Sequence, residues 1–108
     1  MNKIVLLGRL VRDVEENNGI GKLTLAVPRK LSKEKIVDFI NCVAFGNIVK
    51  PLIEYTKKGN RLLIEGRLQI ENYVDKEGNN KQSINVVISD FYFLDYNTEI
   101  KGQIEINK

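Results

Sequence analysis

The stretch DFINCVAF, residues 38–45, predicts a β-strand on which both faces carry apolar side chains that could be buried against a partner. Successive side chains of a strand point to opposite faces. The odd-numbered face carries two aromatic rings with an amide between them: Val37, Phe39, Asn41, Val43 and Phe45. The even-numbered face carries Ile36, Asp38, Ile40, Cys42 and Ala44. A chain of 108 residues builds a single core, so the face with the phenylalanines needs a partner outside that core.

Four other segments have the composition or alternation of strands: residues 2–11, 22–28, 61–73 and 83–94. The turn signal Asn18-Gly19 predicts that the first two form a β-hairpin, with Gly8 as a bulge or a point of close approach. One helix is predicted after residue 45. It would begin at Asn47 as N-cap, group Ile48, Leu52 and Tyr55, and end at Lys57, Lys58 and Gly59.

The predicted order is three strands, a helix and two strands. This order is typical of an all-β OB-fold, a five-stranded Greek-key barrel with one short helix between strands 3 and 4. An open sheet covered by one helix would use the same elements. We assign residues 1–96 to this domain and residues 97–108 to a short C-terminal tail or an added strand.

The outer face of strands 2 and 3 is where OB-folds bind oligonucleotides or oligosaccharides. Exposed aromatic rings there would stack on bases of any sequence. The same parity places Tyr73 outward, on the strand face of Arg67. Charge favours a polyanion partner locally, since residues 1–64 carry 12 Lys and Arg against 6 Asp and Glu, whereas residues 65–108 carry 5 against 8. A set of solvated lysines would explain the charge equally well.

Five segments, in order, carry a family resemblance: NKIVLLGRLVRDVE, KLTLAV, DFINCVAFGN, YTKKGNRLLIEGRLQIENY and DKEGN. Over residues 1 to about 94 the chain resembles the bacterial and phage single-stranded DNA-binding proteins. The resemblance implies sequence-independent binding and protection of single-stranded DNA in DNA replication, recombination and repair. It also implies a homotetramer or dimer that pairs through the first strand.

The resemblance assigns roles to individual residues. Phe39 and Tyr73 stand where the family has stacking tryptophans, and Phe45 matches a stacking phenylalanine. Basic residues near the family's phosphate path correspond to Lys3, Lys57 and Lys58. Parity, charge and position add further candidates: Arg9, Arg12, Lys30, Lys33, Arg61 and Arg67 for phosphates, and Tyr55 for stacking.

The chain departs from the family pattern in three respects. It has no tryptophan, which makes each stacking surface smaller. Glu71 and Asn72 replace residues that are often basic in relatives. The chain ends in QIEINK, without the acidic tip through which relatives recruit replication and repair enzymes. Two explanations remain: a tail that was cut short, or a short mobile-element or phage version that binds DNA without recruiting these enzymes.

The residue inventory argues against an enzyme. Without histidine there is no ordinary general base near neutral pH, and the single Cys42 cannot build a thiolate metal site, so we expect no catalytic residue, metal or cofactor. Cys42 is expected to be a small buried side chain. No apolar run is long enough to span a membrane, and a cytoplasmic location, at a bacterial nucleoid or in a phage-infected cell, is expected. Two other readings stay open: an OB-fold for protein contacts, as in a primosome, and a single-stranded RNA binder.

Overall fold

The structure is a computed structural model that describes residues 1–31 and 33–95. Its strands are β1 (Ile4–Leu10), β2 (Glu15–Asn17), β3 (Ile20–Pro28), β4 (Val37–Ala44), β5 (Arg61–Val74) and β6 (Asn80–Phe93). A 3₁₀ turn, η1 (Gly46–Ile48), leads into the helix α1 (Val49–Tyr55). The predicted tail, residues 97–108, lies outside the described residues.

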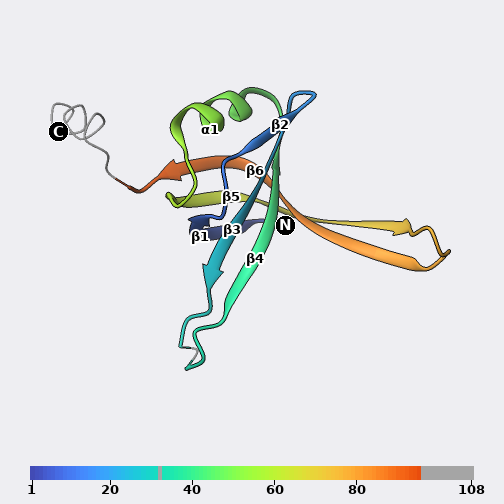
Figure 1. Cartoon of the computed structure of the whole chain (residues 1–108). Helices are drawn as coiled ribbons and strands as arrows, with labels where there is room; N and C mark the ends of the chain where they lie inside the picture. Colours follow the sequence, from blue (N-terminus) through green and yellow to red (C-terminus); the bar gives the residue numbers. More distant parts are fainter. Residues whose placement is uncertain (32, 96–108) are drawn as a thin grey trace, which may run out of the picture.

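The strands close into a barrel. Within the described residues they follow the order β1-β5-β6-β4-β3-β2, and a further pairing of β1 with β3 closes the sheet, with β2 outside the closed ring of strands (Figure 1). β4 and β6 pair in parallel, whereas the other pairs are antiparallel. Five long strands with one short helix after β4 form the predicted OB-fold, and the open-sheet alternative is wrong.

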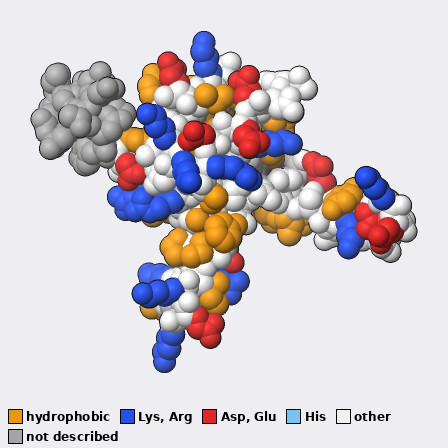
Figure 2. Space-filling view, viewed as in Figure 1, with side chains coloured by type: hydrophobic (Ala, Val, Ile, Leu, Met, Phe, Trp, Pro, Cys, Tyr) orange, Lys and Arg blue, Asp and Glu red, His pale blue; other side chains and the backbone are white. Residues whose placement is uncertain are grey.

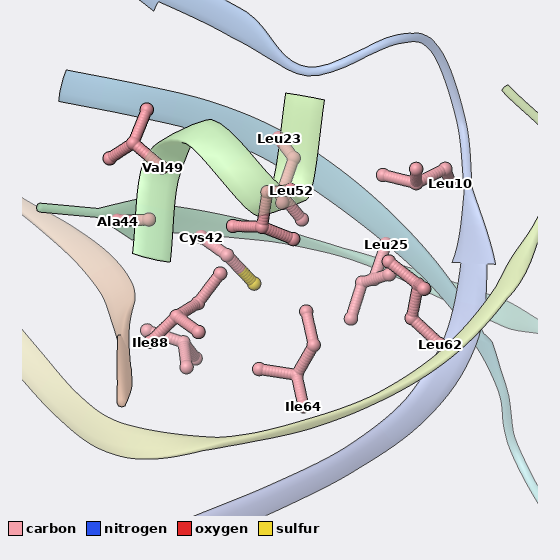
Figure 3. Packing of buried hydrophobic residues seen from close by; sticks show 11 residues of the cluster. Leu10, Leu23, Leu25, Cys42, Ala44, Val49, Leu52, Leu62, Ile64 and Ile88 are labelled. Carbon is pink, nitrogen blue, oxygen red and sulfur yellow. The ribbon is translucent and has the colours of Figure 1, made fainter. Parts of the chain in front are cut away.

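The core fills the inside of the barrel with side chains from its five long strands and from α1 (Figure 3). Its buried apolar residues are Leu10, Leu23, Leu25, Cys42, Ala44, Val49, Leu52, Leu62, Ile64, Val86 and Ile88. Burying one leucine or isoleucine side chain contributes about 1.5–3 kcal/mol. Cys42 and Ala44 are part of this core, so the even-numbered face of β4 is the inward face, as predicted.

The predicted hairpin is only partly correct. The tight turn at Asn18 and Gly19 connects β3 to the short strand β2, with φ angles of 54° and 79° that suit a type I′ turn. β1 meets β3 only at Arg9 and Leu10 and pairs mainly with β5. Gly8 lies where β1 passes from one partner to the other, and a Cβ there would be 2.7 Å from the carbonyl oxygen of Ala26. The prediction of close approach at Gly8 is confirmed.

The predicted start and end of the helix are wrong. Asn47 lies inside η1 and is not an N-cap, and α1 ends at Tyr55 rather than at Lys57 to Gly59. Local sequence signals suggested Asn47 because its side chain can cap a helix. The chain instead turns at Gly46, which has a φ of 70°, and then buries Val49 and Leu52 against the barrel. Packing against the core therefore decides which helical face is inward.

β5 and β6 leave the barrel as a two-stranded arm, on the right of Figure 1. The departure follows a register shift at Glu65 and Gly66, where an added Cβ would collide with the carbonyl oxygen of Val87. Beyond this point Leu68 and Ile70 are exposed, although their alternation in sequence is that of a half-buried strand. The β3–β4 hairpin projects as a second arm, at the bottom of Figure 1.

Candidate nucleic-acid interface

The outward face of β3 and β4 presents the two phenylalanines. Phe39 is 66% exposed and Phe45 is 52% exposed. They are six residues apart, which corresponds to about 20 Å along an extended chain. Figure 2 shows hydrophobic side chains gathered over the lower parts of β3 and β4, with Lys and Arg side chains above and below them. The prediction that the odd-numbered face of β4 points away from the core is confirmed.

A groove of about 300 Å³ lies on this face. The β4 residues that line it, 41–43, fall between Phe39 and Phe45 in the sequence. Its lining includes two basic side chains, one carboxylate and three uncharged polar side chains: Arg12, Lys22, Glu15, Thr24, Asn41 and Asn85. The Thr24 hydroxyl donates a hydrogen bond of 3.1 Å to Asn41 Oδ1. Lys22 was missed among the candidate residues, although its alternation with the buried Leu23 was a signal that it points outward.

A second groove, of about 400 Å³, brings Arg9 and Arg61 together. Ala26 pairs with Phe39 on one side and with Arg9 on the other, so this groove adjoins the first aromatic ring. Arg9 donates to the carbonyl oxygen of Gly59 at 2.9 Å. The groove thus places two arginines on the sheet face near Phe39.

Arg61 is already paired with a carboxylate. Its Nε lies 3.1 Å from Asp95 Oδ1, and its backbone N–H donates to Asp95 Oδ2 at 2.6 Å. The backbone hydrogen bond makes the larger contribution, and together the two bonds hold the pKa of Asp95 below its ordinary value. The predicted phosphate contact at Arg61 would therefore compete with Asp95.

A third groove, of about 330 Å³, brings Lys3 and Arg67 together beside Glu65. Arg67 donates to Gln69 Oε1 at 2.7 Å and has no carboxylate partner among the described residues. Its guanidinium charge is therefore available to a phosphate. The sequence did not show that Lys3, before β1, lies near Arg67 on β5.

Tyr73 lies near the end of the β5–β6 arm, opposite Lys81. It is 51% exposed and contributes to a shallow recess of about 530 Å³ with Val74 and Asn80. Six residues separate it from Arg67, so the two side chains point to the same face of the arm at about 20 Å spacing. The arm thus presents a ring and a cation away from the barrel.

The remaining candidates lie outside the sheet face. Lys30 and Lys33 are exposed in the loop between β3 and β4, where the neighbouring Arg29 forms an ion pair with Asp38 at 3.0 Å. Tyr55 is 57% exposed at the end of α1 and lines none of the grooves described above. The structure therefore does not bring Tyr55 together with the other stacking candidates.

Lys57 and Lys58 follow the helix, and both are exposed. Their backbone N–H groups donate to Asn60 Oδ1 and Asp13 Oδ1, each at 2.7 Å. These bonds hold the turn and leave both ammonium groups in solvent.

Another exposed aromatic residue has an acidic environment. The Tyr92 hydroxyl donates to Asp90 Oδ2 at 3.3 Å, and the charges of Asp90 and Glu65 raise the pKa of Tyr92. A nucleic acid would be repelled here, so Tyr92 is an aromatic ring outside the expected path.

Residues 1–94 match the family described as the single-strand binding protein family. The chain belongs to this family. The single-stranded DNA-binding protein of Clostridium perfringens is 35% identical to this family member over 101 residues, which cover 88% of the chain and 67% of that relative. The corresponding protein of Onion yellows phytoplasma is 32% identical over 99 residues, which cover 88% of the chain and 95% of that relative.

The mitochondrial single-stranded DNA-binding protein Rim1 of S. cerevisiae shares the fold of this family member. The two superpose with a TM-score of 0.71 at 19% identity, over 88% of this chain and 96% of Rim1. The family resemblance and the OB-fold inferred from the sequence are both confirmed.

Two further features bear on other kinds of function for this family member. Among the described residues no three His, Cys, Asp or Glu side chains form a group that could hold a metal ion. In the same residues no helix has the length and apolar character to cross a membrane.

Proposed function

We propose that this protein binds single-stranded DNA without regard to sequence and protects it during replication, recombination and repair. The observation that carries the proposal is the pair of exposed rings, Phe39 and Phe45, on a β3–β4 face with basic grooves beside it. Each stacked base would contribute about 1–3 kcal/mol, whatever its identity.

The phosphates would be bound by the basic side chains in and around the grooves. Arg12 and Lys22 line the groove around Asn41, Arg9 lies in the groove that adjoins Phe39, and Lys3 lies with Arg67 near the start of the arm. Each phosphate contact releases condensed counterions, which makes binding weaker as salt rises. The loop and turn lysines would extend this path: Lys30, Lys33, Lys57 and Lys58. No bond is made or broken, so the proposed function needs no cofactor.

Tyr73 would continue the stacking surface along the β5–β6 arm. Its side chain points to the same face of the arm as Arg67, and Lys81 faces it from β6. DNA that leaves the sheet near Arg67 would therefore meet another ring with a cation beside it. Unpaired bases held in this way cannot form hairpins.

We further propose that the protein acts as a homo-oligomer, a dimer or a tetramer, through β1. Residues 4–8 of β1 pair only with β5 among the described residues, so their other edge is open to a strand of a second copy. Val5 and Leu7 are 52% and 47% exposed on this strand. Several linked DNA sites would raise the avidity for long strands.

The proposal is tested by fluorescence anisotropy with labelled oligo-dT, a matched duplex and a matched RNA, each at low and moderate salt. We expect tight, salt-sensitive binding to oligo-dT and little binding to duplex. Phe39→Ala, Phe45→Ala and Tyr73→Ala should each weaken binding about 5- to 150-fold, the range that loss of one stacked base gives.

Tyr92→Ala is the matched control, because it removes an exposed ring from an acidic surface. It should leave the affinity for oligo-dT unchanged. Equal affinity for single strands and duplex would contradict the proposal and favour a protein partner for the aromatic face. Tighter binding to RNA than to DNA would favour the RNA-binding alternative.

A further inference from the structure

Asn41 occupies a special position on the proposed DNA-binding face. It is two residues from Phe39 on the same side of β4, a spacing of about 7 Å. A base stacked on or next to the Phe39 ring would bring its hydrogen-bonding edge over Asn41. The side chain of Asn41 is exposed, and it lines the groove of Arg12, Lys22 and Thr24.

The Asn41 amide has a preferred orientation. Because Thr24 donates to Asn41 Oδ1 at 3.1 Å, one lone pair of that oxygen is occupied. Thr24 is itself buried by neighbouring groups, at 9% exposure, and is paired with Asn41 across the two strands. The Nδ2 group, with two N–H donors, makes no hydrogen bond within the described residues and is the free end of the amide.

The groove around Asn41 is richer in donors than in acceptors. Lys22 and Arg12 present only N–H groups. Asn85 can donate or accept, and Glu15 is the one carboxylate among the lining residues described. Bases differ in what they present to such a surface: thymine has a carbonyl at the position where cytosine has an amino group. A donor-rich groove favours the carbonyl.

We propose that Asn41, oriented by Thr24, is a specificity-determining residue that favours bases with a carbonyl at this edge, such as thymine, over bases with an amino group, such as cytosine. The inference rests on the proposed function, and it adds a moderate base preference to binding that is otherwise independent of sequence. One hydrogen bond gained or lost corresponds to about a two- to tenfold ratio of affinities.

The test compares the dissociation constants of dT12 and dC12 at pH 7.5 by competition in fluorescence anisotropy. The two oligomers carry the same number of phosphates, so their ratio reports the bases alone. The wild type should bind dT12 about two- to tenfold more tightly. Asn41→Ala should bring the ratio close to one, and Thr24→Val should reduce it because the amide is no longer held in one orientation.

Asn41→Asp is the decisive variant. A carboxylate only accepts hydrogen bonds, so the ratio should shift toward dC12 even though both affinities fall through charge repulsion. Glu16→Gln is the matched control, because Glu16 is exposed on the neighbouring β2 and does not line the groove, and it should leave the ratio as in the wild type. Thermal melts of each variant would establish that the barrel is intact.

The inference is overturned if the wild-type ratio is one, if Asn41→Ala and Asn41→Asp leave it unchanged, or if Glu16→Gln alone abolishes it. These outcomes leave the proposed function standing when both oligomers still bind. Failure of both oligomers to bind would overturn the proposed function, and the inference with it.

Discussion

Arg61 and Arg67 lie on the same strand but differ in free charge. Arg61 is paired with Asp95, whereas Arg67 donates to the neutral Gln69 and has no carboxylate partner among residues 1–31 and 33–95. We predict that Arg67→Ala lowers the slope of log affinity against log salt by about 0.7, the value for one phosphate contact with a single strand. Arg61→Ala should lower it by clearly less. Titrations of oligo-dT at several salt concentrations measure both slopes.

The double variant Arg61→Ala/Asp95→Asn serves as the control, because it removes the ion pair without changing net charge. Its slope should match that of the wild type. Equal losses of slope in Arg61→Ala and Arg67→Ala would show that Asp95 does not withhold Arg61 from the DNA.

Cys42 is predicted to be unreactive in the folded protein. Its side chain is 1% exposed, and burial raises the pKa of its thiol from 9.0 to about 12. At pH 8 the thiolate, which is the nucleophile, is then reduced on the order of a thousandfold relative to the unfolded chain. Reaction with a chromogenic disulfide reagent should be slow in buffer and rapid in denaturant. Rapid labelling of the native protein would contradict the buried placement.

The raised pKa of Cys42 also makes the protein less stable as pH rises above 9.0. The unfolded thiol loses its proton near pH 9.0, but the folded one keeps it to about pH 12. The contribution of Cys42 to the unfolding free energy is therefore complete below pH 9.0 and is lost as pH rises through this window. A Cys42→Val variant should lack this component in denaturant titrations.

At the scale of the elements, the bulge at Glu65 and Gly66 directs the β5–β6 arm. An added Cβ at Gly66 would overlap the carbonyl oxygen of Val87 on the neighbouring strand. We predict that Gly66→Ala lowers the unfolding free energy by about 1–3 kcal/mol, as overpacking of a fitted site does. Urea titration monitored by circular dichroism measures the change.

Ser89→Ala is a suitable control for Gly66→Ala. Ser89 and Gly66 both line the groove of Lys3 and Arg67. The side chain of Ser89 is exposed, and it donates one hydrogen bond to the carbonyl oxygen of Glu65. This variant should cost much less stability. If Gly66→Ala unfolded at the same urea concentration as the wild type, β5 and β6 would be able to separate locally without loss of stability.

At the scale of the whole molecule, the open edge of β1 determines the proposed assembly. We predict that Leu7→Lys yields a monomer, because a charge would have to be buried where β1 meets its copy. Light scattering at micromolar concentration measures the mass. Because Leu7 also lines the groove of Arg9 and Arg61, the second readout is the ratio of the affinities for a long and a short oligo-dT, which should fall in the variant as avidity is lost.

Ile53→Lys on α1 is the control for the assembly, because Ile53 is also an exposed apolar residue, at 39%, but on the helix. It should keep the wild-type mass. A monomeric wild type would remove the assembly proposal without affecting the fold, and an oligomeric Leu7→Lys variant would place the contact elsewhere.

Much of the fold was predictable because alternation in a strand is a local property. The two faces of β4 followed from parity alone, and so did the inward placement of Cys42 and Ala44. The order of strands and helix was typical of the barrel but also fitted an open sheet, which only the pairing of β1 with β3 excluded. The family followed from five motifs in register along residues 1–94.

Local sequence failed where partners distant along the chain decide the outcome. Packing of Val49 and Leu52 on the core determined the helical face, and the capping signal of Asn47 did not. The alternating Leu68 and Ile70 lie on an arm outside the core, because β5 is longer than the barrel wall it crosses. Neither result can be derived from short-range spacing.

The sequence by itself determined the strand parities and the outward rings, since these depend on spacing within single elements, and its five family motifs indicated the OB-fold. Only the tertiary structure decided which charges remain free and which polar groups meet. Asp95 reaches Arg61 across 34 residues, and Thr24 reaches Asn41 across 17. The physical reason is that hydrogen bonds and ion pairs depend on distances in space, and chain closure brings together groups whose separation in sequence carries no such information.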